Sequence, residues 1–399
     1  MVRRARDEYL CGMKKSLLFL PGPVAVAEPV LAAMARPLEN HRGPEFAGRL
    51  IRVSDRLKPI FGTTGPVVLL GSSGTGGMEA AVSSMFSPGD TLLACPIGVF
   101  GKRFAEIARG FGCTVEVLET PAGASLDPNA FAARLKADTG KNIAGVLLTH
   151  NETSTGVQND MSRYAAALRE HGALSVVDSV SGFGATYFKM DEWGYDVVVT
   201  ASQKALAAPP GMAMVALGAR AVARLETSTC SRYYFDLKKA LEFSKIGQTP
   251  WTPPLSIVYA LDAALDRYEA TGADAVVERH ALYARAIRAA FQALGFEIFS
   301  RPGAHSATVV AAVPPEGVDP ARLLDSLRLE RGIILSGGQA ELAGKIVRMG
   351  TMGDISETDI LGAIGAIEIA LLEADAPVHL GAGVQAALRE LIGKTAVPA

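Results

Sequence analysis

A single lysine stands in an otherwise small and apolar stretch of this 399-residue sequence. Residues 200–213 read TASQKALAAPPGMA, in which Lys204 is the only ionisable side chain. Burial among apolar groups disfavours the ammonium form of a lysine and lowers its pKa, so that the neutral amine becomes available as a nucleophile. The surroundings of Lys204 therefore predict a reactive amine.

Two other segments carry groups that would complement this amine. Residues 71–81 (GSSGTGGMEAA) connect an apolar run to a helical pattern, and their glycines would let backbone N–H groups approach an anion at a helix N-terminus. The segment is neither a P-loop nor GxGxxG, and by itself it fits a flexible turn as well as a phosphate site. Asp178 ends another apolar run, as either a cap or the partner of a buried cation, and Lys204 follows 26 residues later.

The elements that would position these groups follow an α/β pattern. From residue 65 onward, short apolar runs alternate with amphipathic helical patterns, which predicts a mostly parallel sheet covered by helices on both faces. After a proline-rich break at 245–256, a long helical region precedes shorter strands and helices, which indicate a smaller α+β domain with an antiparallel sheet. We interpret the chain as a disordered N-terminal extension (1–15), a large domain (16–255), and a linking helix with a small C-terminal domain (256–399).

This arrangement suggests a cofactor. Ligands of open α/β sheets bind at the carboxyl ends of the strands, so Asp178, Lys204 and the turn at 71–76 are expected to share one cleft. A phosphate cradle, an acid and a lysine together point to pyridoxal 5'-phosphate (PLP). The lysine would form a Schiff base with the aldehyde, and the aspartate would pair with the pyridinium nitrogen.

Composition excludes several other classes of protein. The net charge of −2 and the pI of about 6.3 lack the basic excess of nucleic-acid binding, and no apolar run reaches the roughly 18 residues of a membrane span. The four cysteines form no CxxC and none stands beside a histidine at ligand spacing, so we expect no metal site. Unpaired cysteines also fit a reducing compartment, which we take to be the cytoplasm.

Several motifs together resemble the class V aminotransferases of PLP fold type I, and most closely their alanine/serine–glyoxylate (serine–pyruvate) branch. The resemblance extends from about residue 18 to about residue 370. The motifs that carry it, in order, are PGP (21–23), SGTGGMEAA (73–81), HNETSTGV (150–157), VDSVSGFG (177–184), SQKALAAPPG (202–211), TPWTPP (249–254) and KIVRMGTMG (345–353).

The resemblance implies a role for each matching residue. Lys204 would be the Schiff-base lysine and proton shuttle, Asp178 the partner of the ring nitrogen, and Arg348 the group that grips the substrate α-carboxylate. The other implied site residues are Ser73, Gly74, Thr75 and Gln203 at the phosphate, Thr153 at the phenolic oxygen, Phe100 and Val180 on the two faces of the ring, Gly22 at the substrate, and Thr252 at the phosphate of the neighbouring subunit's cofactor.

Three of these segments need comment. Phe100 stands where the family often has tryptophan, and phenylalanine stacks on the ring with less area. Thr75 stands where relatives often carry histidine. His41 and Arg42 match a segment that approaches the neighbouring active site, so we consider them as substrate-side residues, whereas His150 is interpreted as a packed histidine.

The activity implied is transfer of an amino group from a small amino acid, alanine or serine, to a small 2-oxo acid, glyoxylate or pyruvate. It would follow a ping-pong mechanism in a homodimer with shared active sites. A class V lyase or cysteine desulfurase is the first alternative, but the sequence has no cysteine after Cys230. A non-catalytic PLP-fold binding protein is the second, and the set of Lys204, Asp178 and Arg348 argues against it.

Overall fold

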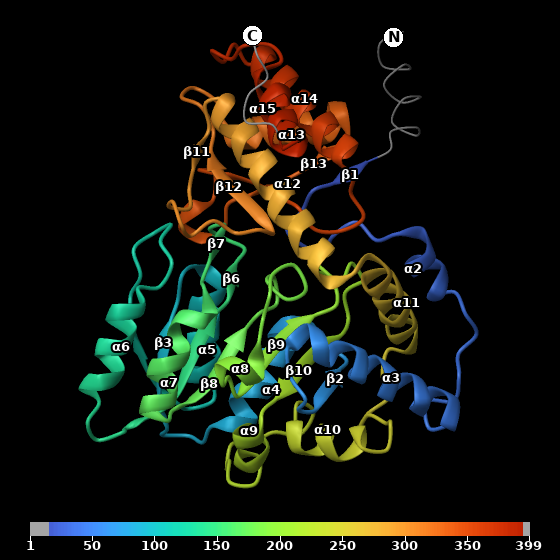
Figure 1. The fold of residues 1–399 in the computed structure, drawn as a ribbon, viewed down its shortest axis with the longest axis vertical. Helices are drawn as coiled ribbons and strands as arrows, with labels where there is room; N and C mark the ends of the chain where they lie inside the picture. The colour runs from blue at the N-terminus through green and yellow to red at the C-terminus, as the bar shows by residue number, and fades with distance from the viewer. Residues whose placement is uncertain (1–15, 394–399) are drawn as a thin grey trace.

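The computed structural model of the chain describes residues 16–393, so the predicted extension at residues 1–15 lies outside the described residues. Its main feature is a seven-stranded sheet that is parallel except for one strand, which is antiparallel to both of its neighbours. This agrees with the mostly parallel sheet expected from the sequence (Figure 1). In spatial order the strands are β2 (Val67–Leu70), the antiparallel β10 (Ala213–Leu217), β9 (Val197–Ala201), β8 (Leu174–Asp178), β5 (Ile143–Thr149), β3 (Thr91–Cys95) and β4 (Thr114–Val117).

Helices cover both faces of this sheet because its strands are apolar on both sides. In β2, Val67 and Leu69 belong to one hydrophobic core and Val68 and Leu70 to another. The first core includes residues of α3 (Pro44–Phe61), α6 (Pro128–Ala137), α7 (Ala165–His171) and α11 (Leu255–Thr271); the second includes residues of α4 (Gly74–Met85), α5 (Val99–Gly110), α9 (Ala219–Arg224) and α10 (Leu237–Ser244).

A smaller antiparallel sheet and four helices form the C-terminal part, drawn in orange and red above the large sheet (Figure 1). Helix α12 packs against α15, which the sequence pattern did not reveal, and also against α14. The strands are β11 (Glu297–Ile298), β12 (Val309–Val313), β15 (Val347–Gly350) and β14 (Ser336–Gly337), and the helices are α12 (Ala273–Ala293), α13 (Pro320–Arg331), α14 (Glu357–Glu373) and α15 (Ala382–Leu391).

The start of the described chain reaches this C-terminal part. Strand β1 (Leu17–Leu18) pairs in parallel with β13 (Ile333–Ile334), and Phe19 is fully buried in the third hydrophobic core, beside residues of α12 and α14. From there the chain continues to Pro21 and Gly22, which lie against Lys204 of the large sheet. The boundary that we placed between residues 255 and 256 stays a prediction.

Shorter elements complete the connections. They are α2 (Glu28–Ala33), α8 (Met190–Trp193), the hairpin of β6 (Asn151–Glu152) and β7 (Val157–Gln158), and the 3-10 turns η1 (Met161–Tyr164) and η2 (Ala340–Leu342). Between residues 16 and 393, no helix combines the length and the apolar character that crossing a membrane requires.

Candidate active site

Lys204 lies three residues beyond the end of β9 and is almost entirely buried. Its side chain is 9% exposed, and Nζ donates a hydrogen bond of 2.6 Å to the carbonyl oxygen of Pro21. Burial lowers the pKa of Lys204 to about 8, against the opposing charges of Asp178 and Glu152. The dry surroundings that the sequence indicated for this lysine are therefore present, and the neutral amine is far more abundant near neutral pH than it is for a solvated lysine.

Gly22 leaves room for the end of this lysine. Its φ of +120° lies in the region that favours glycine, and a Cβ placed there would lie 2.4 Å from Lys204 Nζ. A residue from the N-terminal segment thus borders the reactive amine, at the place where the resemblance put the substrate.

Asp178 ends β8 with its carboxylate buried at 4% exposure. Its Oδ1 accepts a hydrogen bond of 2.9 Å from the backbone N–H of Val180. Burial raises the pKa of Asp178 to about 6, and the nearby charge of Lys204 acts in the opposite direction. Asp178 lies opposite Val199 of the neighbouring parallel strand β9, which Lys204 follows, so the two groups lie at the same edge of the sheet, and each shifts the pKa of the other.

The glycine-rich turn meets the end of the same strand. A Cβ on Gly74 would lie 2.7 Å from the side chain of Val180, so the start of α4 packs directly against the segment that follows Asp178. Ser73 is the N-cap of α4, but its side chain makes no capping hydrogen bond. The N–H groups of Gly74 and Thr75 also find no acceptor among residues 16–393. These free donors at a helix N-terminus suit a phosphate.

Two further residues of the expected set offer polar groups. The side-chain oxygen of Gln203 is buried with no hydrogen bond in residues 16–393, and Thr153, 5% exposed, carries a hydroxyl beside the buried Glu152. A buried polar group without a partner is costly, so such groups mark a place where a polar ligand fits. Together with Lys204, Asp178 and the free amides of α4, they form a donor set that fits PLP.

Arg348, on β15, is held rigidly with its charge unpaired. Its Nε donates to the carbonyl oxygen of Gly337 at 2.8 Å and its Nη1 to that of Thr153 at 2.9 Å, with 4% of the residue exposed. Burial lowers the pKa of Arg348, and no carboxylate between residues 16 and 393 forms an ion pair with it. Its charge lowers the pKa of Lys204, so it acts on the same cleft. An arginine in this state suits the carboxylate of an incoming substrate.

Glu152 is a site residue whose role the sequence did not suggest. It is fully buried, and its Oε2 accepts hydrogen bonds from the N–H groups of Phe100 (3.0 Å) and Gly101 (3.1 Å) in the first turn of α5. The carboxylate thereby fixes the helix end that carries Phe100. Its neighbour Thr153 was recognisable from its motif, but a glutamate at the end of an apolar run gives no sign of which helix it will meet.

Three residues that the resemblance assigned to the active site have no contact with Lys204, Asp178 or Arg348 among the hydrogen bonds and ion pairs of residues 16–393. Thr252 is exposed and lies along a hollow with Gly71 and Tyr234. Arg42 donates to Gln248 Oε1 and to the carbonyl oxygen of Thr249, both at 2.8 Å, and His41 precedes it as a half-buried side chain. Since their expected roles involve a neighbouring subunit, those roles stay predictions.

Comparison with protein families gives a match over most of the chain. Residues 40–353 match the model of the family described as aminotransferase class-V. The chain is 37% identical to the protein named soluble hydrogenase 42 kDa subunit of Anabaena cylindrica. This alignment of 377 residues covers 94% of this chain and 98% of that relative. It is 38% identical over 376 residues to the L-aspartate–glyoxylate aminotransferase of Paracoccus denitrificans, covering 93% and 94% of the two chains.

Comparison with solved structures points to the same group. The pyridoxamine–pyruvate aminotransferase of Mesorhizobium loti matches with a TM-score of 0.90 and 30% identity, over 96% of this chain and 99% of the other. The two proteins therefore share the fold described above, in both the large sheet and the C-terminal part. From the family match, the sequence relatives and the shared fold, we conclude that this chain belongs to the class V aminotransferases, which are PLP-dependent transaminases of fold type I.

Proposed function

We propose that this enzyme transfers the amino group of a small amino acid, alanine or serine, to a small 2-oxo acid, glyoxylate or pyruvate. The observation that carries the proposal is geometric: Asp178 ends β8, Lys204 follows the neighbouring parallel strand β9, and Arg348 donates to the carbonyl oxygen of Thr153. The pKa of Lys204 is lowered, that of Asp178 is raised, and Arg348 has no ion-pair partner in residues 16–393. Oppositely shifted pKa values in one buried place are typical of catalytic sites.

The residues of the chain would share the work as follows. When bound, PLP supplies an electron sink for the reacting amino acid. Gly74, Thr75 and Ser73 hold its phosphate, and Asp178 holds a proton at the ring nitrogen. Lys204 would hold the cofactor's aldehyde end and move a proton at Nζ, for which a pKa of about 8 is well matched to neutral pH.

Substrate orientation falls to Arg348. Its guanidinium is fixed by two backbone carbonyl groups before any ligand arrives, so a bound carboxylate takes one defined position relative to Lys204. Gly22 and Pro21 cover the lysine from the N-terminal side, which limits access of water to Nζ.

Aspartate is a second candidate amino donor. Arg103 is half-buried, its guanidinium lies 4.7 Å from the ring centroid of Phe100, and its charge lowers the pKa of Asp178. No carboxylate between residues 16 and 393 forms an ion pair with Arg103. A second cation beside the cleft would suit the β-carboxylate of aspartate, the donor named for the Paracoccus relative.

A cysteine desulfurase activity is disfavoured by the cysteines. Cys95, Cys113 and Cys230 are buried, and burial raises the pKa of each thiol. A thiol with a raised pKa is a poor nucleophile. All three are free thiols, which supports the proposal of a cytoplasmic location.

A homodimer with shared active sites remains part of the proposal. Tyr233 (71% exposed), Tyr234 (49%) and Ile246 (61%) are large apolar side chains that face solvent in the single chain. Trp251 stacks on Tyr233 with ring centroids 4.9 Å apart, next to Thr252. Exposed aromatic groups gathered in one place favour a protein interface, and burying this one would place Thr252 within a partner contact.

The test is a panel of amino donors against acceptors. We expect purified enzyme with PLP to convert alanine or serine fastest, with glyoxylate or pyruvate as acceptor, as followed by the absorbance of the cofactor. If aspartate is fastest, and Arg103→Gln lowers the aspartate rate while leaving the alanine rate unchanged, aspartate replaces alanine and serine as donor. Failure of every amino acid to convert the cofactor would overturn the aminotransferase proposal.

A further inference from the structure

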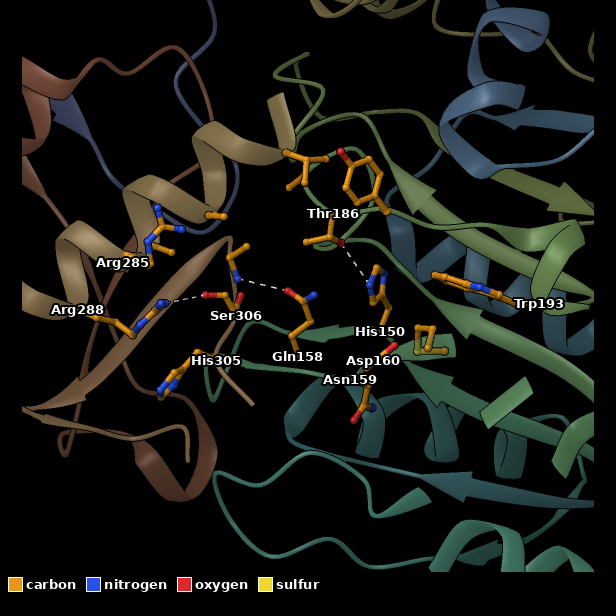
Figure 2. A pocket seen from close by; sticks show the side chains of 17 residues that line it. His150, Gln158, Asn159, Asp160, Thr186, Trp193, Arg285, Arg288, His305 and Ser306 are labelled. Carbon is orange, nitrogen blue, oxygen red and sulfur yellow. Dashed lines mark hydrogen bonds between the residues drawn. The ribbon is translucent and has the colours of Figure 1, made fainter. Parts of the chain in front are cut away.

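A cavity lined by both apolar and polar side chains lies at the junction of the large sheet and the C-terminal part, separate from the site around Lys204. It has a volume of about 490 Å³, and Lys204, Asp178 and Arg348 are not among its lining residues. Figure 2 shows Arg285 and Arg288 extending from α12 on one side of the cavity and His150 and Thr186 on the other. Cavities of this size accommodate small organic ligands.

Arg288 carries an incompletely satisfied charge into this cavity. It is half-buried, and its one hydrogen bond is a long one, from Nη1 to the carbonyl oxygen of Ser306 at 3.4 Å. No carboxylate between residues 16 and 393 forms an ion pair with it. Burial and the charge of Arg285 lower the pKa of Arg288, and the charge of Glu390 acts in the opposite direction without reversing the shift, so the guanidinium sits in an environment that compensates its charge only in part.

The charged neighbours of Arg288 do not neutralise it. Arg285 is exposed and pairs through Nε with Glu390 at 3.4 Å. Asp160 also lines the cavity, but it is exposed and its Oδ1 accepts hydrogen bonds from the N–H and the hydroxyl of Ser162. The α12 side of the cavity therefore has a positive character.

Of the other lining groups, the polar ones are neutral, and the rest are apolar side chains such as those of Trp193, Val277 and Ala281. His305 receives or donates a hydrogen bond at Nδ1 with Ser300 Oγ (2.8 Å), and burial lowers its pKa. His150 is bonded at both ring nitrogens, to Ser179 Oγ (2.8 Å) and Thr186 Oγ1 (3.2 Å), and burial lowers its pKa to about 4. These side chains offer hydrogen bonds and no negative charge.

Gln158 adds a donor between the two sides. Its Oε1 accepts from the backbone N–H of Ala307 at 3.3 Å (Figure 2), and within residues 16–393 its amide N–H₂ has no hydrogen-bond partner. A ligand with an anionic end toward Arg288 and a second oxygen toward Gln158 would satisfy both groups.

We propose that this cavity binds a small organic carboxylate, with its anionic group on Arg288, at a second site distinct from the Lys204 cleft. The planar guanidinium matches a carboxylate through two parallel hydrogen bonds. Phosphate offers similar anionic oxygens, so the experiment compares the binding of a carboxylate with the binding of inorganic phosphate.

The experiment measures binding by calorimetry on the PLP-loaded enzyme, with succinate as the probe because it carries neither an amino nor an oxo group. The Arg348→Gln background removes the carboxylate partner expected in the Lys204 cleft. In this background we expect one succinate to bind per chain. Adding Arg288→Gln should weaken that binding at least about tenfold, whereas Arg279→Gln, on the same helix but outside the cavity, should leave it unchanged.

Three results would overturn the proposal: no succinate binding in the Arg348→Gln background, equal binding after Arg288→Gln, or tighter binding of inorganic phosphate than of succinate. Should Arg288→Gln fail to fold, Arg288→Lys keeps the charge but loses the two-bond geometry, and it should weaken succinate binding by a smaller factor. Binding here is read without turnover, so its outcome is independent of the proposed aminotransferase activity.

Discussion

Arg348 and Arg288 both lack a carboxylate partner among residues 16–393, and they are held very differently. Arg348 is 4% exposed and fixed by the carbonyl groups of Gly337 and Thr153 at 2.8 and 2.9 Å. Arg288 is half-buried and has one bond, of 3.4 Å. A prearranged guanidinium loses less freedom when it binds, so Arg348 suits the positioning that catalysis needs, whereas Arg288 suits reversible and more tolerant binding.

The two regions also differ in the groups that titrate. Around Arg348, Lys204 has its pKa lowered to about 8 and Asp178 has its pKa raised to about 6, so both lie near neutral pH. Around Arg288, His150 has a pKa of about 4 and stays neutral. Proton transfer is therefore available in the Lys204 cleft, and binding without proton transfer is the chemistry left to the junction cavity.

The largest difference between the two regions should appear in Lys204→Ala, which should abolish amino transfer and leave ligand binding in the junction cavity intact. Removing the amine removes both the link to PLP and the proton carrier, so we expect the first half-reaction to fall by at least about 10²–10⁴-fold. Succinate binding in the junction cavity should not change. Mass spectrometry after borohydride treatment should find PLP attached to Lys204 in the unsubstituted enzyme. Retained amino transfer in the variant would contradict the assignment of Lys204.

A smaller effect is expected from Arg348→Gln, which tests the prearranged arginine. Loss of the partner of a desolvated carboxylate costs about 2–5 kcal/mol, so the KM of the amino donor should rise roughly 30-fold or more. The thermal midpoint should change little, since glutamine retains hydrogen-bonding capacity toward the carbonyl of Gly337 or Thr153. Arg279→Gln is the matched control and should leave KM unchanged. An unaltered KM in Arg348→Gln would show that another group binds the carboxylate.

The smallest effect concerns the pH at which the protein without cofactor captures PLP. Only the neutral amine of Lys204 reacts, so the capture rate should rise with pH and level off above about 8 rather than above 10.5. The negative charge of Asp178 raises the pKa of Lys204, so Asp178→Asn should move this midpoint to lower pH. Stopped-flow absorbance across pH 6–10 measures both. A midpoint near the ordinary lysine value would show that the amine is solvated.

The same two groups make opposite contributions to stability. The lowered pKa of Lys204 means that the unfolded chain binds more protons between about pH 8 and 10.5, so this group makes stability rise with pH in that window. The raised pKa of Asp178 means that the folded chain binds more protons between about pH 4 and 6, so stability falls as pH rises there. The buried site is thus maintained at a cost to stability near neutral pH.

Much of the large sheet was predictable from local pattern. Runs such as residues 67–70 and 213–217 are apolar throughout because both faces of their sheet are covered, and the helices between them show one apolar face. The pattern could not show that β10 enters the sheet antiparallel between β2 and β9, since strand order depends on packing between distant segments. The helix at 382–391 was missed, although its burial against α12 becomes evident in the fold.

The sequence by itself determined the order of strands and helices, the lone lysine in a dry stretch, and the acid and glycine-rich turn at strand ends. These features are local, because the spacing of apolar residues and the residue types of a turn depend only on neighbouring positions in the chain. Only the tertiary structure decided that Gly22 borders Lys204, that Thr153 holds Arg348, and that Arg288 faces a cavity. Such contacts join residues far apart in the chain, and the packing of whole elements, not local preference, sets them.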